Sequence, residues 1–98
     1  MLELTEDLIL EGDNLALLAQ LPDGAFDLVY IDPPFNTGKV QALHGGSYAD
    51  AFEDYVGFLL PRLEHARRVL ADHGTLYVHL DPREAHYVKV LLLSLIHI

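Results

Sequence analysis

Apolar and polar residues alternate in blocks along this chain of 98 residues, and the block lengths are typical of strands and helices. Short apolar runs at residues 8–10, 26–31 and 75–80 predict three strands. Apolar residues spaced by three and four between residues 52 and 70 predict one long helix with an apolar stripe. A final helix is expected to open at Asp81-Pro82, since proline suits a first helical turn. Strands that alternate with helices predict an α/β fold of parallel strands with flanking helices.

Turn-forming residues mark the ends of the first two strands. Asn14 is expected to cap a short leucine-rich helix, which Pro22–Gly24 should stop. The second strand is predicted to be buried, Tyr30 included. It should end at Asp32-Pro33-Pro34, because proline cannot donate to a strand ladder. The polar, glycine-containing stretch 36–47 is interpreted as a loop.

The long helix carries signals at its start, middle and end. Asp50 with Glu53 three residues later resembles a capping arrangement. Pro61 lies inside the apolar stripe and is expected to kink the helix or to split it in two. Asp72-His73-Gly74 is expected to end the helix before the third strand. Its charged residues are interpreted as a solvated face: Arg62, Glu64, Arg67 and Arg68.

Composition places the chain among soluble globular proteins. Hydrophobic residues make up 51% of it, so a core can form, although a chain this short would fold only marginally alone. The absence of cysteine excludes disulfides and thiolate metal sites. The acidic start is no signal peptide, and the apolar run 88–98 is shorter than the ~20 residues that span a bilayer. We therefore expect a cytoplasmic location and no membrane partner.

The charge argues against strong nucleic-acid binding by this segment itself. The formal net charge is −9 and only six residues are Lys or Arg, whereas phosphate binding depends on such residues. The histidines do not have the spacing of a metal site, and we expect none. They are His44, His65, His73, His79, His86 and His97.

The most informative stretch is Asp32–Lys39, with the sequence DPPFNTGK. It follows the carboxyl end of a strand, where open α/β sheets place their ligands. A bare DPP could be a turn after any strand, so the residues around it decide the interpretation.

DPPF after the strand FDLVYI resembles the catalytic motif of amino-methyltransferases that act on DNA. The extension Asn36–Lys39 is similar to a subgroup that includes the modification subunits of type III restriction systems. LILEGDN at residues 8–14 and LYVHLD at 76–81 are also similar, and the resemblance covers residues 5 to 92. It implies a partial Rossmann-like, S-adenosylmethionine-dependent methyltransferase fold of the permuted (beta) class. Aspartate first in the motif resembles the adenine-N6 enzymes, whereas serine there marks the cytosine-N4 enzymes.

The resemblance implies a role for each motif residue. Asp32 and the carbonyl of Pro33 would accept the two N–H bonds of the adenine N6 amine and direct its lone pair toward the methyl donor. Pro34 helps to present these carbonyls rigidly. Phe35 would stack on the base, which must leave the duplex to be reached. Asn36 is a further candidate substrate-binding residue.

Other candidates have two readings each. Asp13, besides Asp32, is a candidate contact of S-adenosylmethionine, or else a helix cap. Lys39 would touch a phosphate near the flipped base, or is a solvated lysine. His79 and Asp81, at the end of the third strand, would line the pocket or satisfy backbone groups. His86 and Tyr87 are interpreted as packing or surface residues.

The resemblance implies that residues 1–92 are the N-terminal part of a catalytic domain, with a recognition region and a glycine-rich cofactor loop downstream. Leu93–Ile98 matches the translation of a transposase end sequence used in sequencing adaptors, and we expect read-through; a natural helix end is the alternative. The fragment alone should be inactive. Expected partners are double-stranded DNA, a restriction subunit and a second copy. Rival functions are methylation of RNA or a protein amide, or a small non-catalytic domain.

Overall fold

The computed structural model describes residues 2–33, 39–43, 46–50 and 54–96. Its helices and strands follow in the order α1 (Asn14–Leu18), β1 (Phe26–Ile31), β2 (Lys39–Leu43), β3 (Gly46–Asp50), α2 (Tyr55–Val69), β4 (Leu70–Val78) and α3 (Pro82–Ile96). This is an α/β arrangement with flanking helices, as predicted.

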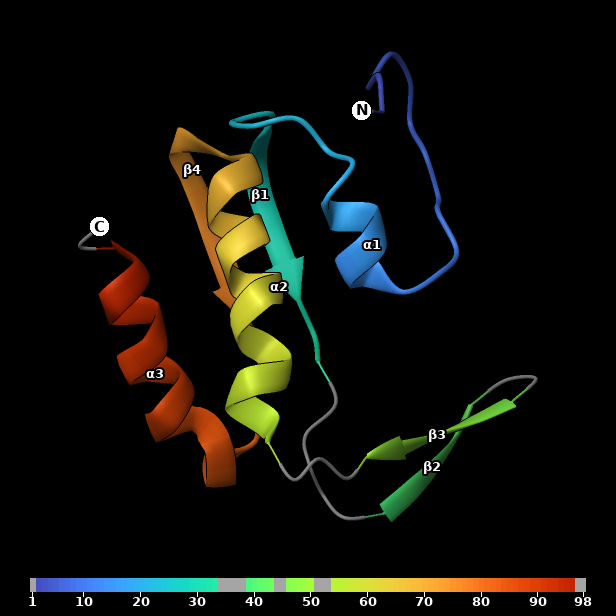
Figure 1. The fold of residues 1–98 in the computed structure, drawn as a ribbon, viewed down its shortest axis with the longest axis vertical. Coiled ribbons are helices and arrows are strands. Elements are labelled where there is room, and N and C mark those ends of the chain that lie inside the picture. Colours follow the sequence, from blue (N-terminus) through green and yellow to red (C-terminus); the bar gives the residue numbers. More distant parts are fainter. Residues whose placement is uncertain (1, 34–38, 44–45, 51–53, 97–98) are drawn as a thin grey trace.

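The central feature is a parallel pair of strands, β1 and β4. Their register pairs Leu28 with Thr75 and continues residue by residue to Ile31 with Val78. The amide of His79 then donates to the carbonyl of Ile31 at 2.9 Å, which extends the ladder past the ends of both strands. Helix α2 lies over one face of this pair, with α3 and α1 on either side of it (Figure 1).

The expected strand at residues 8–10 is wrong, and the described parallel sheet has two strands and not three. Ile9 is fully exposed, and Leu8 and Leu10 are each 44% exposed. An apolar run becomes a strand only where a neighbouring backbone takes its hydrogen bonds. Among the described residues, no strand pairs with residues 8–10.

The loop expected at 36–47 is also wrong over much of its length. β2 and β3 pair there as an antiparallel hairpin, with Lys39 opposite Asp50 and Leu43 opposite Gly46. Polar and glycine content suggested a loop, but an antiparallel hairpin can keep one side in water and needs few apolar residues.

Helix α2 starts later than predicted. Its N-cap is Asp54, whose carboxylate accepts from the amide of Gly57 at 2.9 Å. Asp50 instead ends β3, and Glu53 lies outside the described residues. The helix is therefore capped by an aspartate carboxylate, as expected, but the capping residue lies four residues after the predicted one.

Helix α2 is continuous through Pro61, so the predicted split into two helices is wrong, whereas the alternative, a kink, stays a prediction. Proline cannot donate to the carbonyl of Gly57, but packing of the surrounding apolar stripe holds the helix together. The helix ends at Val69 and β4 begins at Leu70, so Asp72-His73-Gly74 lies inside the strand and is not a helix end.

Helix α1 is capped by Asp13 and not by Asn14. The Asp13 carboxylate accepts from the amide of Leu15 at 3.2 Å. The helix ends at Leu18, before the Pro22–Gly24 turn, where Gly24 has φ 62°. This left-handed conformation suits glycine, which has no Cβ to clash.

The core lies between α2, α3 and one face of the sheet. The apolar stripe of α2 is buried as predicted, and the buried cluster comprises Tyr55, Leu59, Leu63, Val88 and Leu95. Helix α3 begins at Pro82, also as predicted, and includes residues 93–96. Within the described residues, no helix is long and apolar enough to cross a membrane.

The second face of the β1–β4 pair is open. Leu28 is 57% exposed, Tyr30 62% and Tyr77 59%. The predicted burial of Tyr30 is therefore wrong. Successive side chains of a strand point to opposite faces, so Val29 and Ile31 face the helices. Tyr30 faces the other side, where no described element covers it.

A pocket at the carboxyl end of β1

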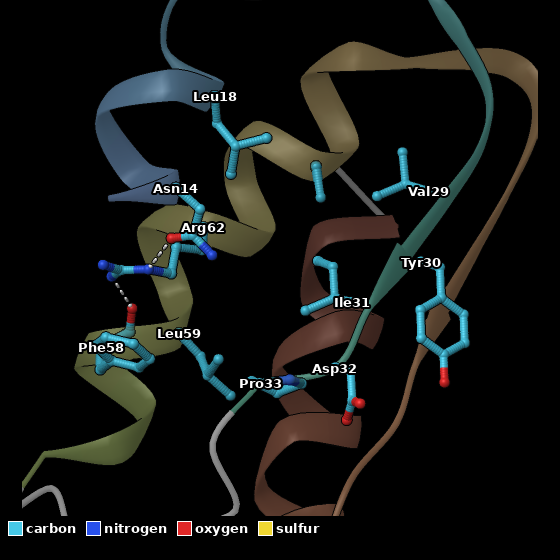
Figure 2. A pocket seen from close by; sticks show the side chains of 11 residues that line it. Asn14, Leu18, Val29, Tyr30, Ile31, Asp32, Pro33, Phe58, Leu59 and Arg62 are labelled. Atoms are coloured by element: carbon cyan, nitrogen blue, oxygen red, sulfur yellow. Dashed lines mark hydrogen bonds between the residues drawn. The ribbon is translucent and has the colours of Figure 1, made fainter. Parts of the chain in front are cut away.

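The candidate site is a pocket of about 290 Å³ where β1 meets α1 and α2 (Figure 2). The strand side is built from the end of β1 and the two residues after it, and the helices close the other side. The lining residues are Asn14, Leu18, Val29, Tyr30, Ile31, Asp32, Pro33, Phe58, Leu59, Arg62 and Ala66. Aliphatic and aromatic side chains dominate, with a few polar groups, which is typical of small-molecule sites.

Asp32 stands at the exit of β1, as the motif predicted. Its side chain is 56% exposed, and one carboxylate oxygen lies 3.4 Å from Nδ1 of His79. Pro33 is buried and lines the pocket, as Leu59 does (Figure 2). The chain therefore places a solvent-accessible carboxylate at the rim of an apolar pocket. The residue after it is a proline, whose ring fixes φ and whose backbone nitrogen carries no hydrogen to donate.

Arg62 belongs to this pocket, so its interpretation as part of a solvated face is wrong. Its side chain is only 12% exposed. The guanidinium donates to Asn14 Oδ1 at 2.7 Å, to the Phe58 carbonyl at 2.8 Å and to Asp13 Oδ1 at 3.1 Å, and it stacks 3.9 Å from the Phe58 ring centre. The bonds to Asn14 and Asp13 tie the start of α1 to α2, and Figure 2 shows the first of them.

Arg68 does the same at the other end of α1. It donates to the carbonyls of Leu18 and Leu21, both at 2.8 Å, and to the carboxylate of Asp23. The Leu18 carbonyl also accepts from the amide of Leu21 at 3.1 Å, so Arg68 adds a second donor to this group and joins the end of α1 and the turn after it to α2. Glu64 and Arg67 are exposed, and for these two the prediction of a solvated face is confirmed.

Asp13 acts as the helix cap, which was one of its two readings. Its Oδ1 receives both the Leu15 amide and a guanidinium N–H of Arg62. Asp13 does not line the pocket, but the next residue, Asn14, does. A contact with a cofactor stays a prediction.

His79 and Asp81 separate in role. His79 contacts Asp32, whereas Asp81 accepts from the backbone amide of Arg83 at 2.9 Å and from its guanidinium at 2.8 and 3.1 Å. These bonds from Arg83 hold the pKa of the Asp81 carboxyl below its usual value. Asp81 therefore follows the alternative reading, a strand-end residue that satisfies backbone groups. Neither residue lines the pocket.

The rest of the predicted site can be placed only in part. Pro34, Phe35 and Asn36 lie outside the described residues. Lys39 begins β2, and its side chain is likewise not described. His86 and Tyr87 are exposed on α3, in line with the surface reading. Over the part of the chain that is described, no three histidine or acidic side chains gather closely enough to hold a metal ion.

Known proteins contain sequences similar to this chain. A family model described as DNA methylase matches residues 26–97. The chain is 40% identical over 92 residues to the probable type III restriction-modification enzyme HindVI Mod subunit of Haemophilus influenzae, covering 89% of this chain and 12% of that protein. It is 36% identical over 100 residues to the type II methyltransferase M.KpnI of Klebsiella pneumoniae, covering 93% and 24%. It is 28% identical over 121 residues to the type III restriction-modification enzyme StyLTI Mod subunit of Salmonella typhimurium, covering 90% and 18%.

These matches confirm the resemblance predicted from the DPPF motif and its flanking strands. The chain spans only 12% to 24% of the length of these three relatives.

Proposed function

We propose a function from one premise: this chain belongs to the DNA methylase family of the N6/N4 type. The full-length protein transfers a methyl group from S-adenosylmethionine to the N6 amine of an adenine in double-stranded DNA. The observation that carries this proposal is the position of Asp32, a half-exposed carboxylate at the carboxyl end of β1 and at the rim of the pocket.

The chemistry asks for two hydrogen-bond acceptors. The N6 lone pair is delocalised into the adenine ring, so the amine is a weak nucleophile. In the proposal one Asp32 oxygen accepts one N–H and the carbonyl of Pro33 accepts the other, which turns the lone pair toward the methyl carbon. The N–C bond forms as the S–C bond breaks, and N6 then loses one proton to solvent. Phe35 stacks on the extruded base.

The residues at the pocket fit one side of the cofactor. S-adenosylmethionine supplies an electrophilic methyl group on a positively charged sulfur. The pocket lies at the carboxyl end of a parallel strand, where α/β proteins hold nucleotide ligands. Asp32 offers negative charge at the rim, with its side chain on the open face of the strand pair, and apolar walls from β1 and α2 line the pocket beside it. Asp13 and Asn14 at the start of α1 are the further candidates to hold it.

The remaining parts of the enzyme belong to the full-length protein. With a net charge of −9 this segment is poorly suited to grip phosphates, so a basic recognition region elsewhere in the protein binds DNA in our proposal. Asn36 and Lys39 assist near the flipped base. A restriction subunit and a second copy of the protein are the proposed partners, because two of the similar proteins are Mod subunits of type III systems.

The test is methyl transfer by the full-length protein, from a gene recovered by sequencing across the codon for Leu92. Asp32→Ala should lower kcat by at least about a hundredfold, comparable to the loss of one transition-state hydrogen-bond partner in other enzymes. Asp27→Ala is the matched control, since Asp27 is an exposed carboxylate at the opposite end of the same strand. Methylation of cytosine N4, RNA or protein would contradict the proposal, as would an active Asp32→Ala variant.

A further inference from the structure

The β1–β4 ladder brings together two polar residues that are 47 positions apart in the sequence. Ile31 pairs with Val78, and the His79 amide donates to the Ile31 carbonyl. The next residues on the two strands, Asp32 and His79, therefore stand side by side at the same edge of the sheet. Their side chains lie on the same face, since both follow the exposed pair Tyr30 and Tyr77 by two residues.

Contact between the two side chains follows from this register. Nδ1 of His79 lies 3.4 Å from Oδ1 of Asp32, and the side chains are 58% and 56% exposed. A pair this accessible to water adds little to folding stability. Its value lies in orientation, because a carboxylate on a strand end can otherwise rotate freely about its side-chain bonds.

We propose that His79 is a positioning residue for Asp32: its Nδ1 side holds one carboxylate oxygen, so that the other faces the amine of the target base. This inference rests on the proposed function, which makes Asp32 the group that touches substrate. An ionised carboxylate has two acceptor oxygens, so one can be held by the protein while the other serves the reaction. A fixed acceptor lowers the entropy that the reacting geometry would otherwise cost.

The same pair of strands carries a built-in control. His73 on β4 and Asp27 on β1 are also in contact, with Nε2 and Oδ1 2.9 Å apart. Their side chains are 78% and 83% exposed, so this pair too is a surface pair between the same strands. It lies away from the carboxyl edge of the sheet and outside the pocket lining. If a histidine variant slowed the reaction only because β1 and β4 were held together less firmly, replacing His73 would slow it as much as replacing His79.

The experiment compares four variants of the full-length protein with the unaltered protein in steady-state methylation of DNA. His79→Ala removes the contact. His79→Asn keeps an N–H donor near the position of Nδ1, His79→Gln places one near Nε2, and His73→Ala is the control. We expect His79→Ala to lower kcat by about tenfold or more, since small misplacements of a reacting group are costly. KM for DNA and for S-adenosylmethionine should stay within about twofold, because the loss concerns orientation and not ground-state binding.

His79→Asn should recover most of the lost kcat, His79→Gln should not, and His73→Ala should match the unaltered protein. The proposal is overturned if His79→Ala keeps the original kcat. It is also overturned if His73→Ala is equally slow, or if Asn and Gln behave alike. An unaltered protein that does not methylate adenine would instead overturn the proposed function, so the two failures are distinguishable.

Discussion

Replacing Arg62 with methionine should loosen helix α1 from the rest of the molecule. Arg62 reaches from α2 to the start of α1, where it donates to Asn14 and Asp13, and it also donates to the Phe58 carbonyl on its own helix. Methionine keeps an apolar stem that can pack on Phe58 but has no donor. Helix α1 has only five residues, too few to be stable without such contacts.

The size of the effect follows from the two bonds that reach α1, since the bond to Phe58 stays within α2. The bond to Asn14 goes to a neutral oxygen from a side chain that is 12% exposed, and it contributes about 1 kcal/mol or somewhat more. The bond to Asp13 goes to a carboxylate that is 65% exposed, so solvent screening holds it below about 1 kcal/mol. Together they give about 1–2 kcal/mol, which corresponds to a roughly 5- to 30-fold change in a local opening equilibrium.

Amide hydrogen exchange measures this opening directly. The reporters are the amides of Leu17 and Ala19, which donate to the carbonyls of Asp13 and Leu15, both at 3.2 Å. Their exchange should accelerate by that factor in Arg62→Met, while amides of β4 keep their rates. Arg67→Met is the matched control, since Arg67 is an exposed arginine on the same helix. Equal exchange in the two variants would refute the assigned role of Arg62.

Two further predictions concern α3 and the core. Arg83→Gln should raise the pKa of Asp81 toward its ordinary 3.8, because the Arg83 side chain is the largest cause of the lowering; an NMR titration of the Asp81 carboxyl that does not move would contradict this. Because the pKa of Asp81 is lowered in the folded protein, the ionised carboxylate stabilises the fold above its ordinary pKa, and this contribution is lost as pH falls through the lowered pKa. Leu63→Ala should cost about 2–5 kcal/mol in denaturant unfolding, because Leu63 is fully buried, whereas Glu64→Ala beside it should cost little.

The parts that the sequence could predict are those with local causes. The apolar stripe of α2 fixes which face is buried, since the spacing of three and four residues leaves little choice. The proline at position 82 fixes the start of α3 in the same way. The position of Asp32 at a strand exit follows from the apolar run before it and the prolines after it.

The roles of Arg62 and Arg68 could not be predicted from the local sequence. Arg62 bonds to Asp13 and Arg68 to the carbonyl of Leu18, and each partner lies about 50 residues earlier in the chain. A faint signal was present. Arg62 is three residues after Leu59 and four before Ala66, both fully buried, so it lies at the edge of the apolar stripe and not opposite to it. Long polar side chains at such an edge commonly bury their stems.

The missing strand and the exposed tyrosine have one common cause, which is that burial on a sheet depends on what covers each face. FDLVYI reads as a strand buried on both faces, as parallel strands usually are. The described helices cover only the face of Val29 and Ile31, and Tyr30 with Tyr77 lines the other. A local pattern states that a face is apolar and cannot state which segment covers it.

The edge of the sheet, unlike its open face, is determined by the backbone alone. The placement of Asp32 beside His79 requires only the β1–β4 register, which pairs each residue from Leu28 to Ile31 with one of β4 and continues in the bond from the His79 amide to the Ile31 carbonyl. If β1 slipped by one residue against β4, the side chain of Asp32 would turn toward the helices while His79 stayed on the open face. A carboxylate would then be buried among leucines without its partner, at a cost of several kcal/mol, so roughly that much free energy holds the register. The proposed chemistry therefore depends on the backbone ladder, and the side chains of α1 and α2 only shape the pocket beside it.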